Sequence, residues 1–252
     1  MTGLTSHETS PLVAIRDLTV AFDGVKVLHG IDLAIHRGEA VGLVGESGCG
    51  KSVTWLAALG LLPKKATITG SVILDGHELI GAAPTTLDSV RGGRIAMIFQ
   101  DPASALNPVI RLGRQVGEAL ALHGGLSGRA IRAEAKRLFD LVGIPDAVRR
   151  LDAFPHELSG GQNQRVMIAM ALAGKPDILV ADEPTTALDA TIQAQILELL
   201  TRIRRETNMA LVLISHDLGV ISETCDRVCV MYAGRIIETA ASKALFEQPL
   251  HP

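Results

Sequence analysis

Apolar and polar residues alternate along the first part of the chain. Apolar side chains stand two residues apart at 13 and 15, again at 18, 20 and 22, and again over 27–35 with His29 in the same phase. A period of two is typical of a β-strand with one buried face. The turn pairs Asp23-Gly24 and Arg37-Gly38 close these segments, so we expect the two strands to pair in an antiparallel sheet.

Two further hairpins are predicted by short apolar segments beside turn pairs. The first has residues 72–74 before Asp75-Gly76, and the second joins 227–231 to 235–238 through Ala233-Gly234. Other apolar runs show no alternation, which is typical of parallel strands buried on both faces. These runs are 40–44, 95–99, 178–183 and 210–214.

The pattern changes to helix between Pro102 and Pro155. In its clearest helix, over 129–142, one stripe holds the apolar residues and the other side holds the charged ones. The stripe consists of Ile131, Ala135, Leu138 and Val142. An all-helical insertion in a strand-rich chain predicts a separate subdomain. Helices are also expected over 52–61, from Ser159 to Gly174, and over 189–206.

Composition narrows the class of protein. The chain has 252 residues, of which 47% are hydrophobic, yet no apolar run approaches the roughly 18 residues that span a bilayer. We therefore expect a soluble protein with a buried parallel sheet. The first dozen residues lack the basic start and apolar middle of a signal peptide, which favours a cytoplasmic location.

Charge and cysteine content argue against a nucleic-acid-binding protein and against a protein held by disulfides. The formal net charge is −3, with scattered Lys and Arg residues, so no nucleic-acid partner is expected. Three cysteines, Cys49, Cys225 and Cys229, are too few and too odd in number for a disulfide framework. We expect Cys225 and Cys229 to be buried as small hydrophobic residues.

A phosphate-binding loop is predicted directly after the apolar run 40–44. Its spacing is G-x-x-x-x-G-K-[ST], and its residues are Gly45, Glu46, Ser47, Gly48, Cys49, Gly50, Lys51 and Ser52. Glycines let backbone N–H groups turn inward around phosphates, where a Cβ would collide. Lys51 supplies positive charge, and the Ser52 hydroxyl can coordinate Mg²⁺ at the start of the next helix. The alternative is a glycine-rich turn without a ligand.

Polar side chains stand where three predicted buried strands end. Asp182 and Glu183 end one apolar run, Gln100 follows another, and His216 follows the last. Asp182 would hold Mg²⁺, and Glu183 would polarise the attacking water. Gln100 would face the nucleotide, and His216 could hydrogen-bond a γ-phosphate or that water. The alternatives are a solvated acidic turn and an ordinary loop histidine.

A second anion-binding element is predicted at a helix start. It consists of Leu158, Ser159, Gly160, Gly161 and Gln162, with Ser159 as N-cap. Consecutive glycines are costly at a helix N-terminus, and a backbone that must approach an anion explains them. A flexible capping turn is the alternative reading.

With these motifs in place, nearly the whole chain resembles the ATP-binding subunit of an ABC transporter. By resemblance, residues 45–52 form the Walker A loop, Gln100 is the Q-loop glutamine and residues 158–162 form the ABC signature. Asp182 and Glu183 would end the Walker B strand, and residues 187–189, ending at Asp189, would form the D-loop. His216 would be the switch histidine, and Phe22 would be the aromatic residue that stacks on adenine. A phenylalanine packed in the core is an equally good reading of Phe22.

The resemblance implies a fold, an activity and ligands. The expected fold is an α/β P-loop NTPase (RecA-like) core with an antiparallel β subdomain and an inserted α-helical subdomain. Residues 1–252 would form one ATP-binding domain, with 12–101 and 177–245 in the core and 102–176 in the helical subdomain. The chain would hydrolyse ATP, with Glu183, His216 and Gln100 as catalytic residues and Mg²⁺ held by Ser52, Gln100 and Asp182.

Residues 99–108 and 183–189 are similar to the subunits that power dipeptide, oligopeptide and nickel importers. This resemblance implies transmembrane permease subunits and a second ATP-binding subunit, identical or related, as partners. An extracytoplasmic solute-binding protein would take part indirectly. The chain would lie peripherally at the cytoplasmic face of the membrane. ATP would be held between Walker A of one subunit and the signature of the other.

Some features depart from the pattern. Asn163 stands where the family more often has a basic or larger residue, and Phe22 replaces the commoner tyrosine. The chain stops at residues 250–252, where peptide-importer subunits usually continue, so a truncated chain or half of a fused protein is expected.

Other functions stay open. Within the importers, the alternative to peptides is nickel or another small solute. A soluble ABC protein of translation or DNA repair would usually carry two cassettes or a long coiled-coil insertion. An unrelated P-loop kinase would leave Ser159 and His216 unexplained, and a phosphoryl-transfer assay with only water as acceptor would separate it from an ATPase.

Overall fold

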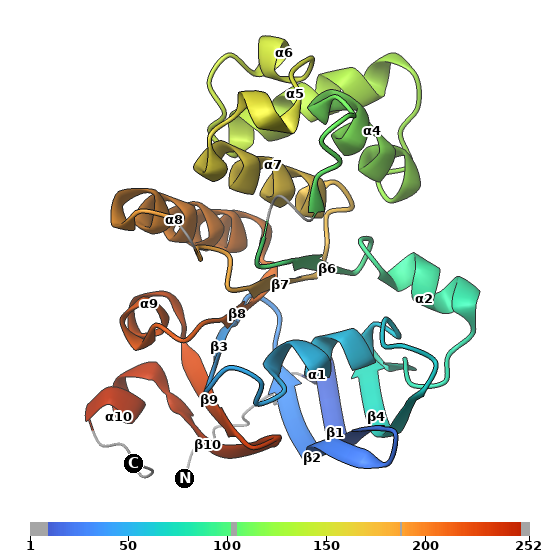
Figure 1. Cartoon of the computed structure of the whole chain (residues 1–252), viewed down its shortest axis with the longest axis vertical. Coiled ribbons are helices and arrows are strands. Elements are labelled where there is room, and N and C mark those ends of the chain that lie inside the picture. Colours follow the sequence, from blue (N-terminus) through green and yellow to red (C-terminus); the bar gives the residue numbers. More distant parts are fainter. Residues whose placement is uncertain (1–9, 102–104, 187, 248–252) are drawn as a thin grey trace, which may run out of the picture.

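Two β-sheets carry the fold, and helices lie around them (Figure 1). The structure, a computed structural model, describes residues 10–101, 105–186 and 188–247. Pro102, Ala187 of the predicted D-loop and the two chain ends lie outside these residues. The predictions that involve them therefore concern residues that the structure does not describe. Within the described ranges, no helix combines the length and apolar character needed to cross a membrane.

The larger sheet has six strands in the order β10-β9-β3-β8-β7-β6. They are β3 (Ala40–Val44), β6 (Ile95–Ile98), β7 (Ile178–Asp182), β8 (Ala210–Ile214), β9 (Arg227–Tyr232) and β10 (Arg235–Ala241). Strands β6, β7, β8, β3 and β9 run parallel, and β10 pairs antiparallel with β9. The predicted buried strands and closing hairpin are confirmed. The hairpin also extends the parallel sheet, because β9 pairs with β3.

The smaller sheet is antiparallel, in the order β2-β1-β4-β5. Its strands are β1 (Val13–Phe22), β2 (Val25–Ile35), β4 (Ala66–Leu74) and β5 (His77–Glu78). The predicted pairing of the first two strands is confirmed, with Val20 opposite Leu28. Strand β4 begins six residues before the predicted segment 72–74 and pairs along β1.

Helices α4, α5, α6 and α7 lie together at one end of the molecule, and the other helices lie around the two sheets (Figure 1). The helices are α1 (Lys51–Ala58), α2 (Pro84–Val90), α4 (Leu112–Leu122), α5 (Arg129–Leu141), α6 (Ala147–Arg150), the 3₁₀ turn η1 (Pro155–Glu157), α7 (Gly160–Leu172), α8 (Ala190–Thr207), α9 (Leu218–Thr224) and α10 (Ser242–Glu247). The apolar stripe predicted for α5 faces inward, with Ala135, Leu138 and Val142 buried. The subdomain boundaries stay a prediction.

One predicted strand residue is wrong. Phe99 was expected at the buried end of the run 95–99, but its exposed fraction is 43%. The β6–β7 ladder ends where Ile98 faces Ala181, so Phe99 lies beyond the sheet. The cysteine prediction is confirmed, since Cys225 and Cys229 are buried. Burial raises the pKa of the Cys225 thiol to about 12, and the nearby charge of Asp226 adds to the shift.

Two hydrophobic cores lie on opposite faces of the six-stranded sheet. One joins α4, α5, α7 and α8 to one face, for example through Leu179 and Leu211. The other joins β1, β2, β4 and α1 to the opposite face, for example through Val180 and Val212. Alternate residues of β7 and β8 therefore belong to different cores, as expected for strands covered on both sides.

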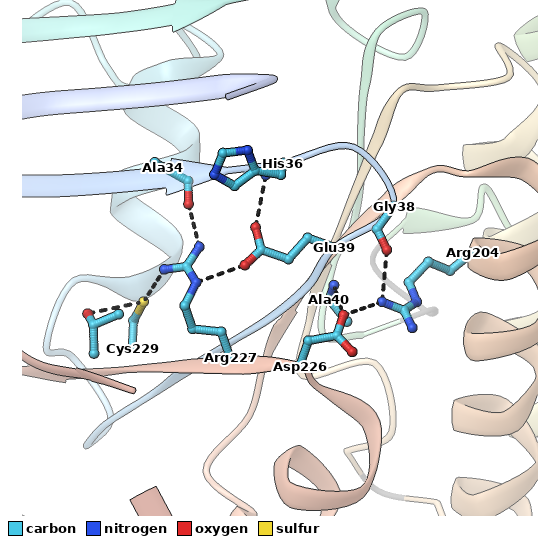
Figure 2. A network of polar contacts seen from close by, with 10 residues as sticks. Ala34, His36, Gly38, Glu39, Ala40, Arg204, Asp226, Arg227 and Cys229 are labelled. Atoms are coloured by element: carbon cyan, nitrogen blue, oxygen red, sulfur yellow. Dashed lines mark hydrogen bonds and ion pairs between the residues drawn. The ribbon is translucent and has the colours of Figure 1, made fainter. Parts of the chain in front are cut away.

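A polar network holds the segment that leads into β3 (Figure 2). Arg227 donates from Nε to Oε1 of Glu39 at 2.8 Å. Asp226 accepts from the backbone N–H of Ala40 at 2.8 Å and from Nη1 of Arg204 at 2.5 Å. Arg204, on α8, is only 8% exposed and also donates to the carbonyl of Gly38 at 2.9 Å. The start of β3 is thus fixed to α8 and β9 together.

Candidate functional site

The loop after β3 has the backbone that a phosphate cradle needs. Gly45, Gly48 and Gly50 have φ angles of 150°, 81° and 106°, a region that glycine adopts without a steric penalty. A Cβ at Gly45 would collide with the Met231 carbonyl oxygen, and one at Gly50 with a methyl group of Leu28. Both contacts require glycine, so packing and phosphate access favour the same residue type.

The ammonium group of Lys51 lies inside this loop. Nζ donates hydrogen bonds to the carbonyl oxygens of Gly45 and Glu46, both at 2.8 Å. Sγ of Cys49 is 3.7 Å from the same nitrogen, and Lys51 is only 6% exposed. The loop therefore holds a positive charge at its centre, where the phosphates of a nucleotide would lie.

The loop faces polar side chains that follow three parallel strands. Because carboxyl ends of parallel strands meet at one edge of a sheet, Gln100 after β6, Asp182 and Glu183 at the end of β7, and His216 after β8 come together. A hollow of about 150 Å³ lies between them and the loop. Its lining consists of Ser47, Gly48, Gly50, Lys51, Ser52, Val53, Gln100, Asp182 and Glu183.

Two side chains donate hydrogen bonds to the carboxylate of Glu183, and a third lies beside it. Nε2 of Gln100 donates to Oε2 at 3.0 Å, and Oγ1 of Thr186 donates to the same oxygen at 3.0 Å. Nδ1 of His216 is 3.3 Å from Oε1. The Glu183 side chain is 18% exposed and His216 is 69% exposed. The carboxylate thus faces the hollow from a fixed position, while the histidine reaches it from solvent.

Asp182, the last residue of β7, is partly buried. Burial raises the pKa of its carboxyl group, and the charge of Glu183 raises it further. A hydrogen bond from Ser52 and the charge of Lys51 oppose this shift. A bound cation would favour the charged carboxylate in the same way as Lys51 does. Carboxylate, hydroxyl and amide oxygens from Asp182, Ser52 and Gln100 are ligands that suit Mg²⁺.

Comparison with known proteins identifies the family. Residues 28–186 match the family model described as ABC transporter. The chain is 51% identical over 252 residues to a Brucella abortus (strain 2308) protein named for peptide import and ATP binding. This alignment covers 98% of the chain and 76% of the relative. The chain belongs to the ABC transporter family.

Two further relatives of this ABC subunit add sequence and structural detail. The dipeptide transport ATP-binding protein DppD of Bacillus subtilis (strain 168) is 47% identical over 247 residues, which covers 96% of the chain and 74% of DppD. The ATP-binding cassette MJ0796, solved as a dimer bound to ADP and Pi, has a TM-score of 0.80 and 29% identity. That alignment covers 91% of this chain and 98% of the cassette. The ABC ATPase fold expected from the sequence is confirmed, and the ABC subunit is an ATPase.

Residues 158–162, the predicted signature of this ABC subunit, lead into the start of α7. Ser159 and Gly160 are exposed. Ser159 caps the helix as predicted, since Oγ accepts from the N–H of Gln162 at 3.3 Å and the Gln162 side chain accepts from the N–H of Ser159 at 3.2 Å. Such a reciprocal capping box satisfies two backbone donors. Neighbouring N–H groups at this helix start remain able to face a ligand.

The two glycines of the signature differ in their surroundings. A Cβ at Gly161 would lie 2.6 Å from Cγ2 of Ile192 on α8, so close helix packing requires glycine there. At Gly160 a Cβ would meet the side chain of Leu188 at an ordinary 3.7 Å. Packing therefore does not require glycine at position 160, and its approach to an anion stays a prediction, whereas Gly161 has a packing reason that the sequence did not reveal.

Some predicted site residues lie outside the hollow. None of residues 158–162 lines it, nor do Phe22 and Asp189. Phe22, the last residue of β1, is partly buried and packs against the core that contains β1 and α1. Asp189 caps α8, because its carboxylate accepts from the N–H groups of Thr191 and Ile192 at 3.1 and 3.0 Å. The functional roles expected for these residues stay predictions.

The sequence pattern missed Thr186 as a contact of Glu183. Its position in a turn after an acidic strand exit carried no signal, because threonine is common in turns. Only the three-residue spacing from Glu183 could have suggested that the hydroxyl returns to the carboxylate.

Proposed function

We propose that this chain is the ATP-hydrolysing subunit of an ABC importer for dipeptides or oligopeptides. The observation that carries the enzymatic part is the convergence of Lys51, Ser52, Asp182 and Glu183 around one hollow. The peptide assignment is supported by the names of relatives at 47 to 51% identity. Uptake of nickel or another small solute is the alternative.

Glu183 would act as the general base in ATP hydrolysis. Its carboxylate would take a proton from a water molecule whose oxygen bonds to the γ-phosphorus. The bond from that phosphorus to the β–γ bridging oxygen breaks, and ADP and phosphate leave. Lys51 would stabilise the phosphate charge from inside the loop. His216 would hydrogen-bond the γ-phosphate or the water, since its exposed ring can turn from Glu183 towards a ligand.

Ser52, Asp182 and Gln100 would hold Mg²⁺ beside the phosphates. Their oxygen donors fit this cation, and the hydrogen bond between Ser52 and Asp182 already places two of them together. Mg²⁺ bound there would neutralise negative charge on the β- and γ-phosphates.

We infer that two such subunits close around ATP. Ser159 and Gly160 are exposed and lie outside the lining of the chain's own phosphate hollow. The hydroxyl of Ser159 and the N–H of Gly160 can therefore face a nucleotide on another subunit. The dimeric form of MJ0796 supports this arrangement. The partner would be a second copy or a related subunit, and closure would depend on nucleotide.

Replacement of Ser159 by Asp tests this arrangement. Asp is as good an N-cap as Ser, so we expect the monomer to fold and bind ATP normally. The added negative charge would oppose the facing γ-phosphate, and ATP-dependent dimerisation should weaken by about tenfold or more. Sedimentation velocity with ATP would measure this in the Glu183→Gln background. Undiminished dimerisation of Ser159→Asp would refute the interface, and Ser159→Asn serves as the uncharged control.

Coupling to permease subunits is proposed at an apolar groove next to Gln100. The groove has a volume of about 600 Å³, and its lining includes Leu61, Phe99, Ala119 and Met170. Leu61 and Phe99 are 45% and 43% exposed. The groove touches β6, α4 and α7, so a docked permease segment would contact two helices and the strand that leads to Gln100. The chain would then lie at the cytoplasmic face of the membrane, and a solute-binding protein would act only through the permease.

Transport by the assembled complex tests the substrate. The subunit would be purified with its neighbouring permease subunits and reconstituted in vesicles. We expect uptake of a labelled dipeptide or oligopeptide that requires ATP and the matching solute-binding protein. Nickel uptake without peptide uptake would favour the alternative, and ATP hydrolysis with no coupled uptake of either would contradict the importer assignment.

A further inference from the structure

The hydroxyl group of Thr186 binds the carboxylate of Glu183. Oγ1 donates to Oε2 at 3.0 Å. Thr186 follows Glu183 by three residues in the turn after β7, and its backbone N–H donates to the Glu183 carbonyl oxygen at 3.2 Å. The residue is partly buried. The turn thus holds both the main chain and the side chain of Glu183 through one residue.

The backbone of Glu183 makes this contact important. Its φ angle is +46°, which is uncommon for a residue other than glycine. The same residue still continues the sheet, because its N–H donates to the carbonyl oxygen of Ile214 at 2.9 Å. This hydrogen bond holds the backbone of Glu183 at the end of the sheet. Because of its positive φ angle, the side chain leaves the backbone in a different direction from that of a strand residue. A local donor is then needed to set the orientation of the carboxylate.

The other two side chains next to the Glu183 carboxylate, Gln100 and His216, come from distant segments of the chain. Gln100 follows β6 and His216 follows β8, and both are exposed. Under the proposed function, both direct polar atoms to the nucleotide, Mg²⁺ or the attacking water. Each can therefore leave Glu183 when ATP binds. Thr186 belongs to the same turn as Glu183 and moves with it.

We propose that Thr186 is a positioning residue for Glu183. Its hydrogen bond occupies a lone pair of Oε2 and restricts rotation of the carboxylate, so that Oε1 is presented to the attacking water. Hydrogen bonds to a charged carboxylate are among the stronger ones in proteins. This inference rests on the proposed function, in which Glu183 is the base.

A pair of Thr186 variants tests the inference. Thr186→Val keeps the β-branched shape and removes the hydroxyl, whereas Thr186→Ser keeps the donor. We expect kcat for ATP hydrolysis to fall about tenfold in Thr186→Val, with KM unchanged, because misplacement of a reacting group reduces rate more than binding. Thr186→Ser should stay within about twofold of the unaltered protein. Thr185→Val is the matched control from the same turn, since the described hydrogen bonds include none from its side chain to Glu183.

The outcomes separate this inference from the proposed function. Loss of turnover in Thr186→Val, with rescue by Thr186→Ser and unchanged affinity for a fluorescent ATP analogue, would support it. Full activity of Thr186→Val beside an inactive Glu183→Gln would overturn the role of Thr186 alone. Full activity of both variants would overturn the assignment of the base. A fall in ATP affinity or in melting temperature that matches the lost turnover would assign the hydroxyl to structure and would also overturn the inference.

Discussion

Glu183→Gln should bind ATP as tightly as the unaltered chain and hydrolyse it at least about a hundredfold more slowly. The amide keeps the shape of the carboxylate and can still accept from Thr186 at one oxygen. It cannot take a proton from water, so the loss should fall on kcat. Single-turnover hydrolysis of radiolabelled ATP measures the rate, and titration with a fluorescent ATP analogue measures the affinity.

A charge-matched control accompanies this variant. Glu206, on the last turn of α8, is exposed. Glu206→Gln removes the same negative charge at a distance from the hollow and should leave turnover unchanged. Hydrolysis by Glu183→Gln at the unaltered rate would disprove the assignment of the base.

Lys51→Ala should weaken ATP binding about 10- to 100-fold. Charge-assisted hydrogen bonds contribute about 1.5 to 3 kcal/mol each, and the variant removes the cation that the loop encloses. It also leaves the carbonyl oxygens of Gly45 and Glu46 without their donor. The loop should then lose part of its shape as well as its charge. Equilibrium titration with a fluorescent ATP analogue would measure the dissociation constant.

Lys64→Ala provides the comparison for this loss of charge. Lys64 is exposed in the segment between α1 and β4, so its removal should leave the dissociation constant unchanged. If Lys51→Ala bound ATP as tightly as Lys64→Ala, Lys51 could not be the phosphate ligand.

The buried strands β3 and β8 were predictable because each is a continuous apolar run. The runs 40–44 and 210–214 match β3 and β8 residue for residue. The first part of β4 was missed although Thr67 and Thr69 alternate with apolar residues, because Gly70, with a φ angle of 99°, interrupts the strand pattern. Helices α2, α9 and α10 have only six or seven residues. Two turns are too short for a 3.6-residue period to emerge.

The candidate site was predictable where chain topology determines it. Residues at the carboxyl ends of neighbouring parallel strands must meet, so Gln100, Glu183 and His216 could be grouped from the sequence. Contacts that depend on local side-chain direction could not. The bonds from Lys51 to its own loop and from Thr186 to Glu183 depend on the φ angles of turns, and no residue pattern determines these angles.

The separation of the two hydrophobic cores has an evolutionary consequence. Buried residues of the two clusters are all different in the described part of the chain, so a substitution in α4 or α5 repacks one cluster and leaves the side chains around β1, β2 and α1 in place. A lineage can therefore diversify its helical half to recognise a new membrane protein and inherit the nucleotide half unchanged. We expect sequence drift among descendants of this gene to be faster in the first cluster than in the second.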